Sequence, residues 1–476
     1  MWWLILVIPA ALLGAVLIRT LRFTPKGETP LQEEPVTVDR ERAVAALQAL
    51  VRCKTVSYRD ASLEDDGEFE KLVGLLPTLY PRVFAACRLT RLDGRALLLR
   101  WPGRGADAPA VLMAHYDVVP VDEEGWEKPP FDGILEDGVL WGRGTLDTKV
   151  TVNGVLSAAE QLLEEGFTPA QDIYFAFSGG EEVNGPGAAN IVTYFEQAGI
   201  TPALVVDEGG AVVENVFPGV RVPCGMVGIA EKGMMDVEYT VRSGGGHASA
   251  PKPKTPVDTL AQACCRLVQH PFKAHLTAPV AAMFDTLGRR STFLYRMIFA
   301  NLWLFMPVLD MICKKSGGEL NALMRTTVAF TQMEGSAASN VIPPKARLVS
   351  NIRLNPADTM DTALAYIRRT VGDDTVEVRA LHGMNPSRIS TVDCDGYRRV
   401  ATAVASTWRG CAVSPYLMVQ CSDSRHYGRI SDRVYRFSAM DLTSEERATI
   451  HGNNERIRVD TLCRAVEFYV RLMKQC

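Results

Sequence analysis

Short apolar segments alternate with segments of helical periodicity through the first half of this 476-residue chain. The apolar segments have the length and composition of buried strands, and the segments between them have the period of helices. Such alternation is typical of an α/β fold, in which a mixed, mostly parallel sheet carries helices on both faces. Ligands in such sheets bind beyond the carboxyl ends of the strands, so we expect the chemistry there. The predicted strands are Ala96–Arg100, Ala110–Met113, Asp172–Phe177 and Ala203–Val206, and the predicted helices include Val150–Glu164 and Ala188–Ala198.

The pattern changes near residue 225 and changes back near residue 386. Between these points, segments such as Arg347–Leu354 alternate apolar and polar residues, which predicts half-exposed strands of an antiparallel sheet. The chain is also longer than the roughly 250–300 residues at which a single core stops growing. We therefore predict a catalytic α/β domain in two parts, residues 40–224 and 386–476, with an α+β domain, residues 225–385, inserted between them.

Residues 1–23 predict a transmembrane anchor. The segment Trp2–Ile18 contains no charged residue and has the length of the shortest membrane-spanning helices, which need roughly 17–25 residues. Arg19, Arg22 and Lys26 follow it directly. A secretory signal peptide carries its basic residues before the apolar segment, so we predict an uncleaved, single-pass transmembrane helix.

The orientation of this anchor is predicted from the charges and the cysteines. Basic residues after the helix favour a catalytic domain on the cytoplasmic side. The 11 cysteines are odd in number and scattered, which is typical of free thiols in a reducing compartment. Residues 24–39 are rich in proline and glutamate, and they predict an extended linker between membrane and domain.

Histidine and carboxylate side chains follow the predicted strands. His115 comes after the second strand, and Asp117 is placed to hydrogen-bond the ring nitrogen of His115 that does not face a metal ion. Asp147 follows glycines just before a helix, where a helix cap would also explain an aspartate. Glu181 and Glu182 follow the third strand, and two adjacent glutamates repel each other unless a cation lies nearby.

Two further candidates complete this set. Asp207 ends the fourth strand, and His451 lies near the C-terminus. Imidazole and carboxylate ligands suit zinc, with manganese or cobalt as alternatives. Because a shared carboxylate can hold two metal ions roughly 3.5–4 Å apart, the pattern predicts a site for two divalent metal ions.

Seven motifs occur in a fixed order along the chain, namely AHYDVVPVD, WGRGTLDTK, FSGGEE, VVDEGG, GGGHASAP, DSRHY and IHGNNERI. Their order resembles metallopeptidase family 20 from about residue 40 to the end, and within it the aminoacylase, carboxypeptidase S and N-acyl amino acid hydrolase group. The resemblance implies one metal ion held by His115, Asp147 and Asp207, and a second held by Asp147, Glu182 and His451. It also implies that Glu181 is the general base and that Asp117 orients His115.

The resemblance assigns residues to substrate binding as well. The inserted domain resembles the lid of the family, which often also dimerises, so a homodimer is expected. His247 matches a histidine that stabilises the oxyanion, often from the partner subunit, and Asn340 matches a substrate contact of the lid. Arg425 resembles the residue that binds the free carboxylate of the substrate, a task for which the bidentate guanidinium is suited. Arg353 is a second candidate for that task, or a residue of a solvated face.

The function expected from this resemblance is hydrolysis of an amide bond next to a free carboxylate, in an N-acyl amino acid or a short peptide. Two enzymes on the same scaffold remain alternatives, an aminopeptidase and a succinyl-diamine deacylase. A catalytically inactive binding protein would have lost Glu181 or a metal ligand, and none is lost. The net charge of −4, without a basic block, excludes a nucleic-acid-binding protein.

One strongly apolar segment, Phe293–Leu309, has no clear place in this scheme. Arg296, Asn301 and Pro307 interrupt it. Three interpretations stay open: a core helix of the lid, a wall for a long acyl chain, and a patch that rests on a bilayer.

Overall fold

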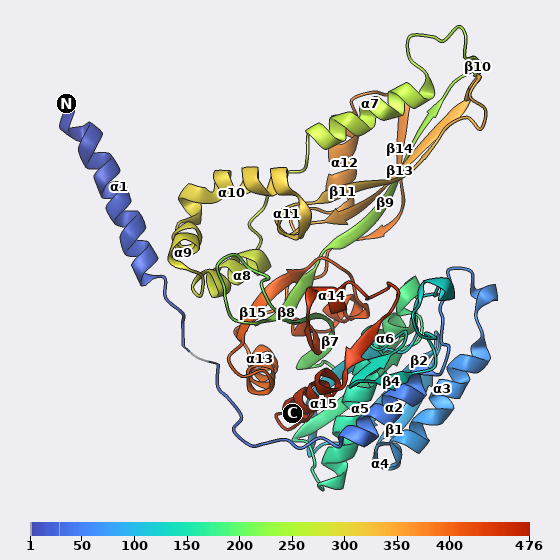
Figure 1. Ribbon diagram of the computed structural model, residues 1–476, viewed down its shortest axis with the longest axis vertical. Coiled ribbons are helices and arrows are strands. Elements are labelled where there is room, and N and C mark those ends of the chain that lie inside the picture. The colour runs from blue at the N-terminus through green and yellow to red at the C-terminus, as the bar shows by residue number, and fades with distance from the viewer. Residues whose placement is uncertain (1, 28) are drawn as a thin grey trace.

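The computed structural model describes residues 2–27 and 29–476, with side chains from residue 7 onward in the first helix. Figure 1 shows a large α/β body, a narrower body above it, and an N-terminal helix that projects to one side. We call the large body the catalytic domain and the narrower one the lid.

An eight-stranded mixed sheet forms the centre of the catalytic domain, in the order β1-β2-β6-β3-β7-β16-β8-β15. Strand β3 pairs in parallel with β6 and β7, β7 with β16, and β8 with β15, whereas β1 and β2 are antiparallel to their neighbours. The mostly parallel α/β sheet is thereby confirmed. Its strands are β1 Arg88–Leu92, β2 Ala96–Trp101, β3 Gly105–His115, β6 Gln171–Ser178, β7 Leu204–Val213, β8 Cys224–Glu231, β15 Ala412–Met418 and β16 Val434–Leu442.

Helices cover both faces of this sheet, as predicted. One face packs against α2 (Arg40–Val51), α5 (Lys149–Glu164), α13 (Asp395–Thr407) and α15 (Val459–Met473), and the other against α6 (Gly187–Ala198). The Asp39 side chain caps α2 by accepting a hydrogen bond from the Arg42 N–H at 3.0 Å. The remaining elements of this domain are η1 Ala61–Leu63, α3 Asp66–Leu79, α4 Pro81–Ala86, η2 Glu123–Gly125, β4 Ile134–Glu136, β5 Val139–Trp141, η3 Glu181–Val183, η4 Asp423–Arg429, α14 Ser444–Arg447 and β17 Arg456–Arg458.

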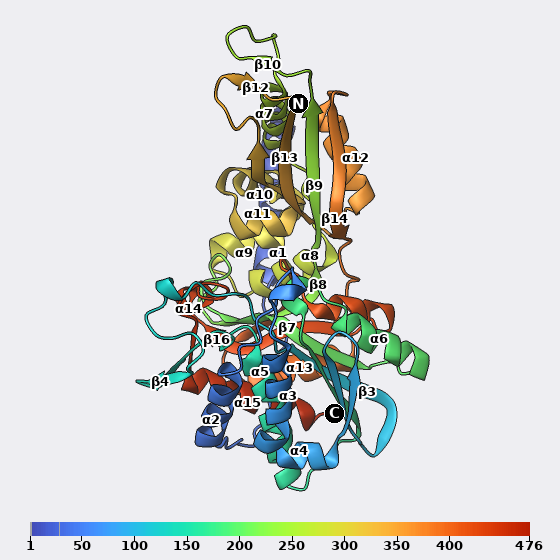
Figure 2. The same ribbon diagram turned by 90° about the vertical axis from the view of Figure 1, so that its right-hand side faces the viewer.

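The lid is a four-stranded antiparallel sheet with helices on one face (Figure 2). Its strands follow the order β11-β13-β9-β14, and its apolar core lies between the sheet and the helices. A two-stranded pairing of β10 with β12 forms the tip of the lid. The elements are β9 Gly233–Arg242, β10 Gly246–His247, α7 Pro256–Gln269, β11 Thr327–Glu334, β12 Val341–Ile342, β13 Lys345–Leu354, α12 Met360–Val371 and β14 Val376–Met384.

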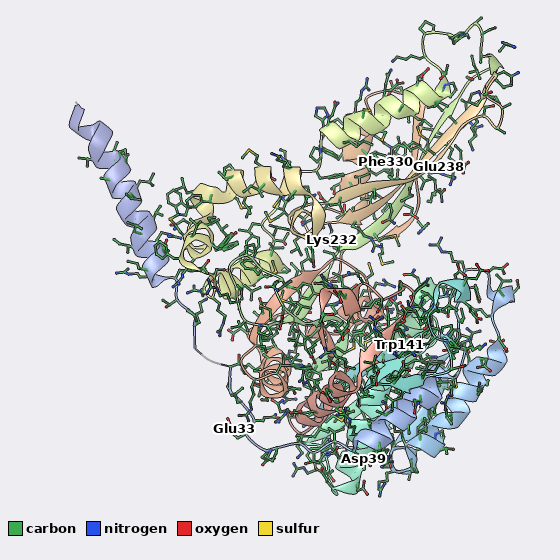
Figure 3. All side chains as sticks on the ribbon, viewed as in Figure 1. Glu33, Asp39, Trp141, Lys232, Glu238 and Phe330 are labelled. Carbon is green, nitrogen blue, oxygen red and sulfur yellow. The ribbon has the colours of Figure 1, made fainter. Side chains whose placement is uncertain are left out.

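The junction between the two bodies lies later in the chain than the boundary predicted at residue 225. Strand β8 belongs to the large sheet, and Lys232 alone separates it from β9 (Figure 3). The Lys232 ammonium donates to the carbonyl oxygens of Ala322 (2.7 Å) and Arg325 (2.8 Å). Burial lowers the pKa of Lys232 to about 7. This buried contact fixes the start of the lid against the end of α11 (Gly318–Met324).

The apolar segment Phe293–Leu309 is not a core helix of the lid. It forms α9 (Phe293–Ala300) and the first half of α10 (Leu302–Ser316), and these helices follow α8 (Ala278–Gly288). Phe299 packs at 4.6 Å from Phe217, between ring centroids, in the cluster of the catalytic domain. Many other side chains of both helices are exposed to solvent.

The N-terminal segment forms helix α1 (Trp2–Arg22). Within the described part of the chain, the structure contains no single helix that meets the length and hydropathy expected of a membrane span, whereas the bent pair α9 and α10 meets them jointly. The side chains of residues 2–6 of the predicted anchor lie outside the described residues. The linker follows the surface of the catalytic domain, where the Gln32 N–H donates to Ser406 Oγ at 2.9 Å.

Candidate metal centre

His115 lies at the carboxyl end of β3 and is buried. Its Nδ1 is 3.0 Å from the carbonyl oxygen of Asp117, an acceptor that makes Nδ1 the protonated nitrogen. The lone pair of Nε2 therefore faces the site, 2.9 Å from Oδ1 of Asp147. The carboxylate of Asp117 accepts hydrogen bonds from the backbone N–H groups of Glu181 (3.1 Å) and Glu182 (3.2 Å). Asp117 thus positions three of the predicted site residues from one point.

Asp147 lies between the two histidines. Its Oδ1 faces His115, and its Oδ2 is 3.0 Å from Nε2 of His451. Glu182 Oε2 is 3.1 Å from the same histidine nitrogen. Burial raises the pKa of Asp147, but the two neighbouring imidazoles outweigh it and bring the pKa below its usual value. One carboxylate that offers an oxygen to each side has the arrangement required of a bridging ligand.

Glu455 holds the loop that carries Asp147, and the sequence analysis did not identify it. Its buried Oε1 accepts the N–H groups of Gly144 (3.1 Å), Leu146 (2.7 Å) and Asp147 (3.1 Å). Its Oε2 pairs with Arg143 at 2.6 Å. The signal was present in the sequence, because Glu455 and Arg143 belong to two of the seven ordered motifs.

The structure places the carboxylate of Asp207 apart from the other predicted metal ligands. Consecutive side chains of β7 point to opposite sides, and the carboxylate of Asp207 turns away from His115 to accept the Ser424 N–H at 2.9 Å. The next residue, Glu208, places Oε1 at 3.3 Å from His115 Nε2. Glu208 therefore occupies the position that the resemblance gave to Asp207.

The clustered carboxylates indicate a cation. Burial, together with the neighbouring carboxylates, raises the pKa of Glu208 to about 8 and that of Glu181 well above its usual value, against the opposite effect of His115. Ligand atoms of His115, Asp147 and Glu182 lie within 4.8 Å of one another, as do those of His115, Glu181 and Glu208. Glu182 Oε1 is buried without a hydrogen-bond partner among the residues that the structure describes. Two histidines and four carboxylates with one orphaned oxygen fit a pair of divalent metal ions.

The residues predicted to bind substrate fall into two groups. Arg425, in η4, donates from Nη2 to Asn184 Oδ1 at 2.9 Å, while its buried Nη1 has no partner in the described part of the chain. Arg353, at the end of β13 that adjoins the catalytic domain, contacts Cys421 Sγ at 3.6 Å. His247 and Asn340 lie together at the exposed tip of the lid, where the Ala248 N–H donates to the Asn340 carbonyl at 3.0 Å. Within one chain the tip is at the far end from the metal centre, so these two residues do not reach it (Figure 1).

A cavity of about 410 Å³ opens directly from the metal centre. At one end it is lined by the carboxylates of Asp147, Glu181, Glu182 and Glu208. Its walls away from these carboxylates are largely apolar. They include Leu146, Val213, Val216, Met226, Tyr416, Met418, Met440, Leu442 and Ile450. Glu319 and Arg447 also line it, so the cavity is largely rather than wholly apolar. Such a cavity next to a polar reaction centre is suited to an apolar group attached to the scissile bond.

The sequence of residues 111–475 matches the model of one protein family, which is described as peptidase family M20/M25/M40. An N-fatty-acyl-amino acid synthase/hydrolase PM20D1 from Xenopus tropicalis is 36% identical over 447 residues, which cover 92% of this chain and 86% of the relative. A probable carboxypeptidase S-like 2 from Dictyostelium discoideum is 32% identical over 486 residues, or 98% of this chain and 93% of the relative.

Solved structures share the fold. A metallo-carboxypeptidase of the M20 family, Sso-CP2 from Sulfolobus solfataricus, has a TM-score of 0.65 at 19% identity and covers 91% of this chain and 98% of its own. The YXEP protein of Bacillus subtilis, a dinuclear metal binding peptidase from the M20 family, has a TM-score of 0.56 at 11% identity. The match covers 91% of this chain and 97% of the YXEP chain. At these identities the likeness is one of fold.

Proposed function

The chain belongs to peptidase family M20/M25/M40, and from that premise we propose that it hydrolyses N-acyl amino acids whose acyl group is long and apolar. One observation carries this proposal: the apolar cavity of about 410 Å³ and the candidate metal centre share the residues Asp147, Glu181 and Glu208. An acyl chain in this cavity would place its carbonyl carbon among those carboxylates. The name of the PM20D1 relative, which acts on fatty-acyl amino acids, supports the same substrate class.

We propose two divalent metal ions, zinc in the first place, as the cofactors. His115, Asp147 and Glu208 would hold one ion, and Asp147, Glu182 and His451 the other. When bound, such ions polarise the amide carbonyl and lower the pKa of water. Imidazole and carboxylate ligands support zinc, and the dinuclear site named for the YXEP structure supports the number.

Side chains of the protein carry out the proton transfer, the positioning of the glutamates and the binding of the substrate carboxylate. Glu181 takes the proton of the attacking water and returns it to the leaving amine, because its buried carboxylate has a raised pKa. Asp117 holds the backbone of Glu181 and Glu182 in place. Arg425 binds the free carboxylate of the amino acid with its unpartnered Nη1.

A carboxypeptidase that cleaves short peptides is the second candidate. It would use the same carboxylate-binding arginine, and the carboxypeptidase S-like relative favours it. The apolar walls of the cavity favour the acyl substrate, because most peptide side chains are polar. An aminopeptidase would leave both the arginine and the apolar walls without a role, and a succinyl-diamine deacylase would leave the apolar walls without one.

Filling the cavity should lower the activity on substrates with long acyl chains and leave the activity on substrates with short ones unchanged. Val216→Trp places a large ring at a half-buried position of the wall. We expect kcat/KM for long-chain N-acyl amino acids to fall more than about tenfold, since each excluded CH₂ costs about 0.8 kcal/mol. N-acetyl amino acids should be hydrolysed at an unchanged rate. Val392→Trp, at an exposed position outside the cavity, is the control. Equal losses on short and long chains would contradict the acyl assignment.

Arg425→Lys tests the carboxylate end of the substrate. Lysine keeps the charge but loses the fork, and a hydrogen bond to a charged group is worth about 1.5–3 kcal/mol. We expect kcat/KM on N-acyl amino acids to fall about 10–100-fold, with little change on the matching carboxamides. Arg429→Lys, which alters a surface pair with Glu196, is the matched control. A similar loss on acids and carboxamides would indicate a structural role for Arg425.

We also propose that α1 anchors the protein in a membrane, with the catalytic domain on the cytoplasmic side. The uncharged segment Trp2–Ile18 continues as one helix to Arg22, and Arg19 and Arg22 form its basic end. Protease added to intact cells should leave the catalytic domain whole. Digestion of that domain would contradict the orientation.

A homodimer through the lid is a further part of the proposal. His247 and Asn340 are adjacent at the tip but lie far from the metal centre of their own chain. Both would gain a role in catalysis if the tip reached the centre of a second copy. A monomeric mass in light scattering, together with full activity, would contradict this assembly.

A further inference from the structure

The corner between α9 and α10 exposes an unusual amount of apolar surface. The two helices meet at Asn301 with a bend of 108°. Single exposed apolar side chains are normal on a protein surface, but several on adjacent helices mark an interaction site. The large apolar side chains exposed here are Phe293, Leu294, Tyr295, Trp303, Val308, Met311 and Ile312.

Helix α1 is fixed to this same corner. The Asn301 amide is fully buried, and its Nδ2 donates to the Val16 carbonyl (3.3 Å) and to Thr20 Oγ1 (3.2 Å). The Arg19 guanidinium donates to the Ala300 carbonyl at 3.2 Å. From there α1 leads away from the corner (Figure 1). Its free part exposes apolar side chains, namely Val7, Ile8, Leu12, Leu13, Leu17 and Ile18.

Arginines lie beside the apolar corner, around a cavity of about 540 Å³. Arg289 is held by Asp285, whereas Arg221, Arg290 and Arg296 form no ion pair within the described part of the chain. Arg221 and Arg290 are exposed, and Nε of Arg296 is buried without a partner. Unpaired guanidinium groups at the edge of an apolar surface are complementary to phosphate groups at the edge of a hydrocarbon layer.

We propose that the α9–α10 corner sits on the lipid bilayer in which α1 is anchored, with the apolar side chains of the corner in the acyl layer and Arg221 and Arg290 on anionic headgroups. The shared hydrogen bonds at Asn301 make the corner continuous with the predicted anchor. That continuity, together with the adjacent cations, favours a bilayer over a protein partner as the occupant. The surface is an in-plane contact, distinct from a second crossing of the membrane.

The position of this surface has a consequence for substrate entry. Helix α11 follows α10 directly, and its Glu319 lines the cavity that opens from the metal centre. Helices α10 and α11 thus connect the bilayer surface to the cavity that would receive an acyl chain. This consequence rests on the proposed function, whereas the bilayer contact does not.

Quenching of tryptophan fluorescence by brominated acyl chains tests the contact. The sample is full-length protein carrying Trp2→Phe and Trp3→Phe, reconstituted in phosphatidylcholine vesicles. Trp303 is the exposed tryptophan of the corner, and its side chain is 56% exposed. We expect brominated phosphatidylcholine to quench emission in this protein, and Trp303→Phe to remove the quenched component. If the protein with Trp303 shows no quenching, the proposal is overturned. It is also overturned if the quenching remains after Trp303→Phe. Since substrate is not involved, failure here would leave the proposed hydrolase standing.

The headgroup contact is tested by charge reversal. Mixing phosphatidylglycerol into the vesicles should increase the quenching of Trp303, and Arg221→Glu with Arg290→Glu should abolish that increase. Because each basic residue near an anionic surface is worth about 1 kcal/mol, two reversals should weaken the contact by more than about tenfold. Arg88→Glu with Arg104→Glu, exposed on the catalytic domain, is the matched control. Equal quenching in neutral and anionic vesicles by the unreversed protein would contradict the role of the arginines.

Discussion

Glu181→Gln is expected to abolish turnover while the protein keeps both metal ions. The Glu181 carboxylate lies within 4.8 Å of the ligand atoms of His115 and Glu208, beside the position where water must be activated. Glutamine preserves the shape of the side chain but cannot accept a proton. Removal of a general base typically costs 10²–10⁴-fold in rate, so kcat should fall at least about a hundredfold. The measurement is kcat on a long-chain N-acyl amino acid, with the metal content determined by elemental analysis of the same sample.

Glu182→Ala supplies the contrast, although the two glutamates are neighbours. Glu182 Oε2 lies 3.1 Å from His451, and its second oxygen is buried without a partner. Its loss should remove a metal ion together with activity. If Glu181→Gln retained more than about a tenth of the rate, the general base would have to be another residue.

The arrangement of the catalytic domain could be predicted from the sequence because each strand is short, apolar and followed by a helix. Strands β3 and β6 and helices α5 and α6 contain the predicted segments, and β7 begins one residue after the predicted start. Parallel strands place their carboxyl ends at one edge, and this brings His115 and Glu182 together from motifs far apart in the chain. Their meeting follows from topology and requires no knowledge of side-chain contacts.

Other features depend on contacts that no local pattern encodes. Glu455 acts on Asp147 from more than 300 positions away, and its motif marks the residue but not the backbone N–H groups that it binds. The apolar segment at α9 and α10 has the composition of a core, yet its surroundings leave it half exposed. The tip of the lid carries His247 and Asn340, but a sequence cannot say how far a lid extends from its domain.

The pair Asp207 and Glu208 shows most clearly where prediction from the sequence ends. The motif contains two adjacent acids, and only one of them can face the metal centre. We expect Glu208→Gln to lose the metal ion that His115 helps to hold, since Oε1 of Glu208 lies 3.3 Å from His115 Nε2. Mutation of a residue that hydrogen-bonds a metal ligand typically lowers metal affinity or activity 10–100-fold, so loss of a ligand itself should lower the rate at least about a hundredfold.

Asp207→Asn should instead keep two metal ions per chain. Its carboxylate accepts the Ser424 N–H at 2.9 Å, a bond that the asparagine oxygen can also accept. Each of the two substitutions replaces a carboxylate by a carboxamide, which keeps an oxygen but loses the negative charge. The two variants therefore differ only in which side of β7 loses its charge. Metal stoichiometry by elemental analysis, at a metal concentration that saturates the unmodified enzyme, decides between them. One ion in the Asp207 variant and two in the Glu208 variant would restore Asp207 as the ligand, and would mean that β7 presents its other side to the metals.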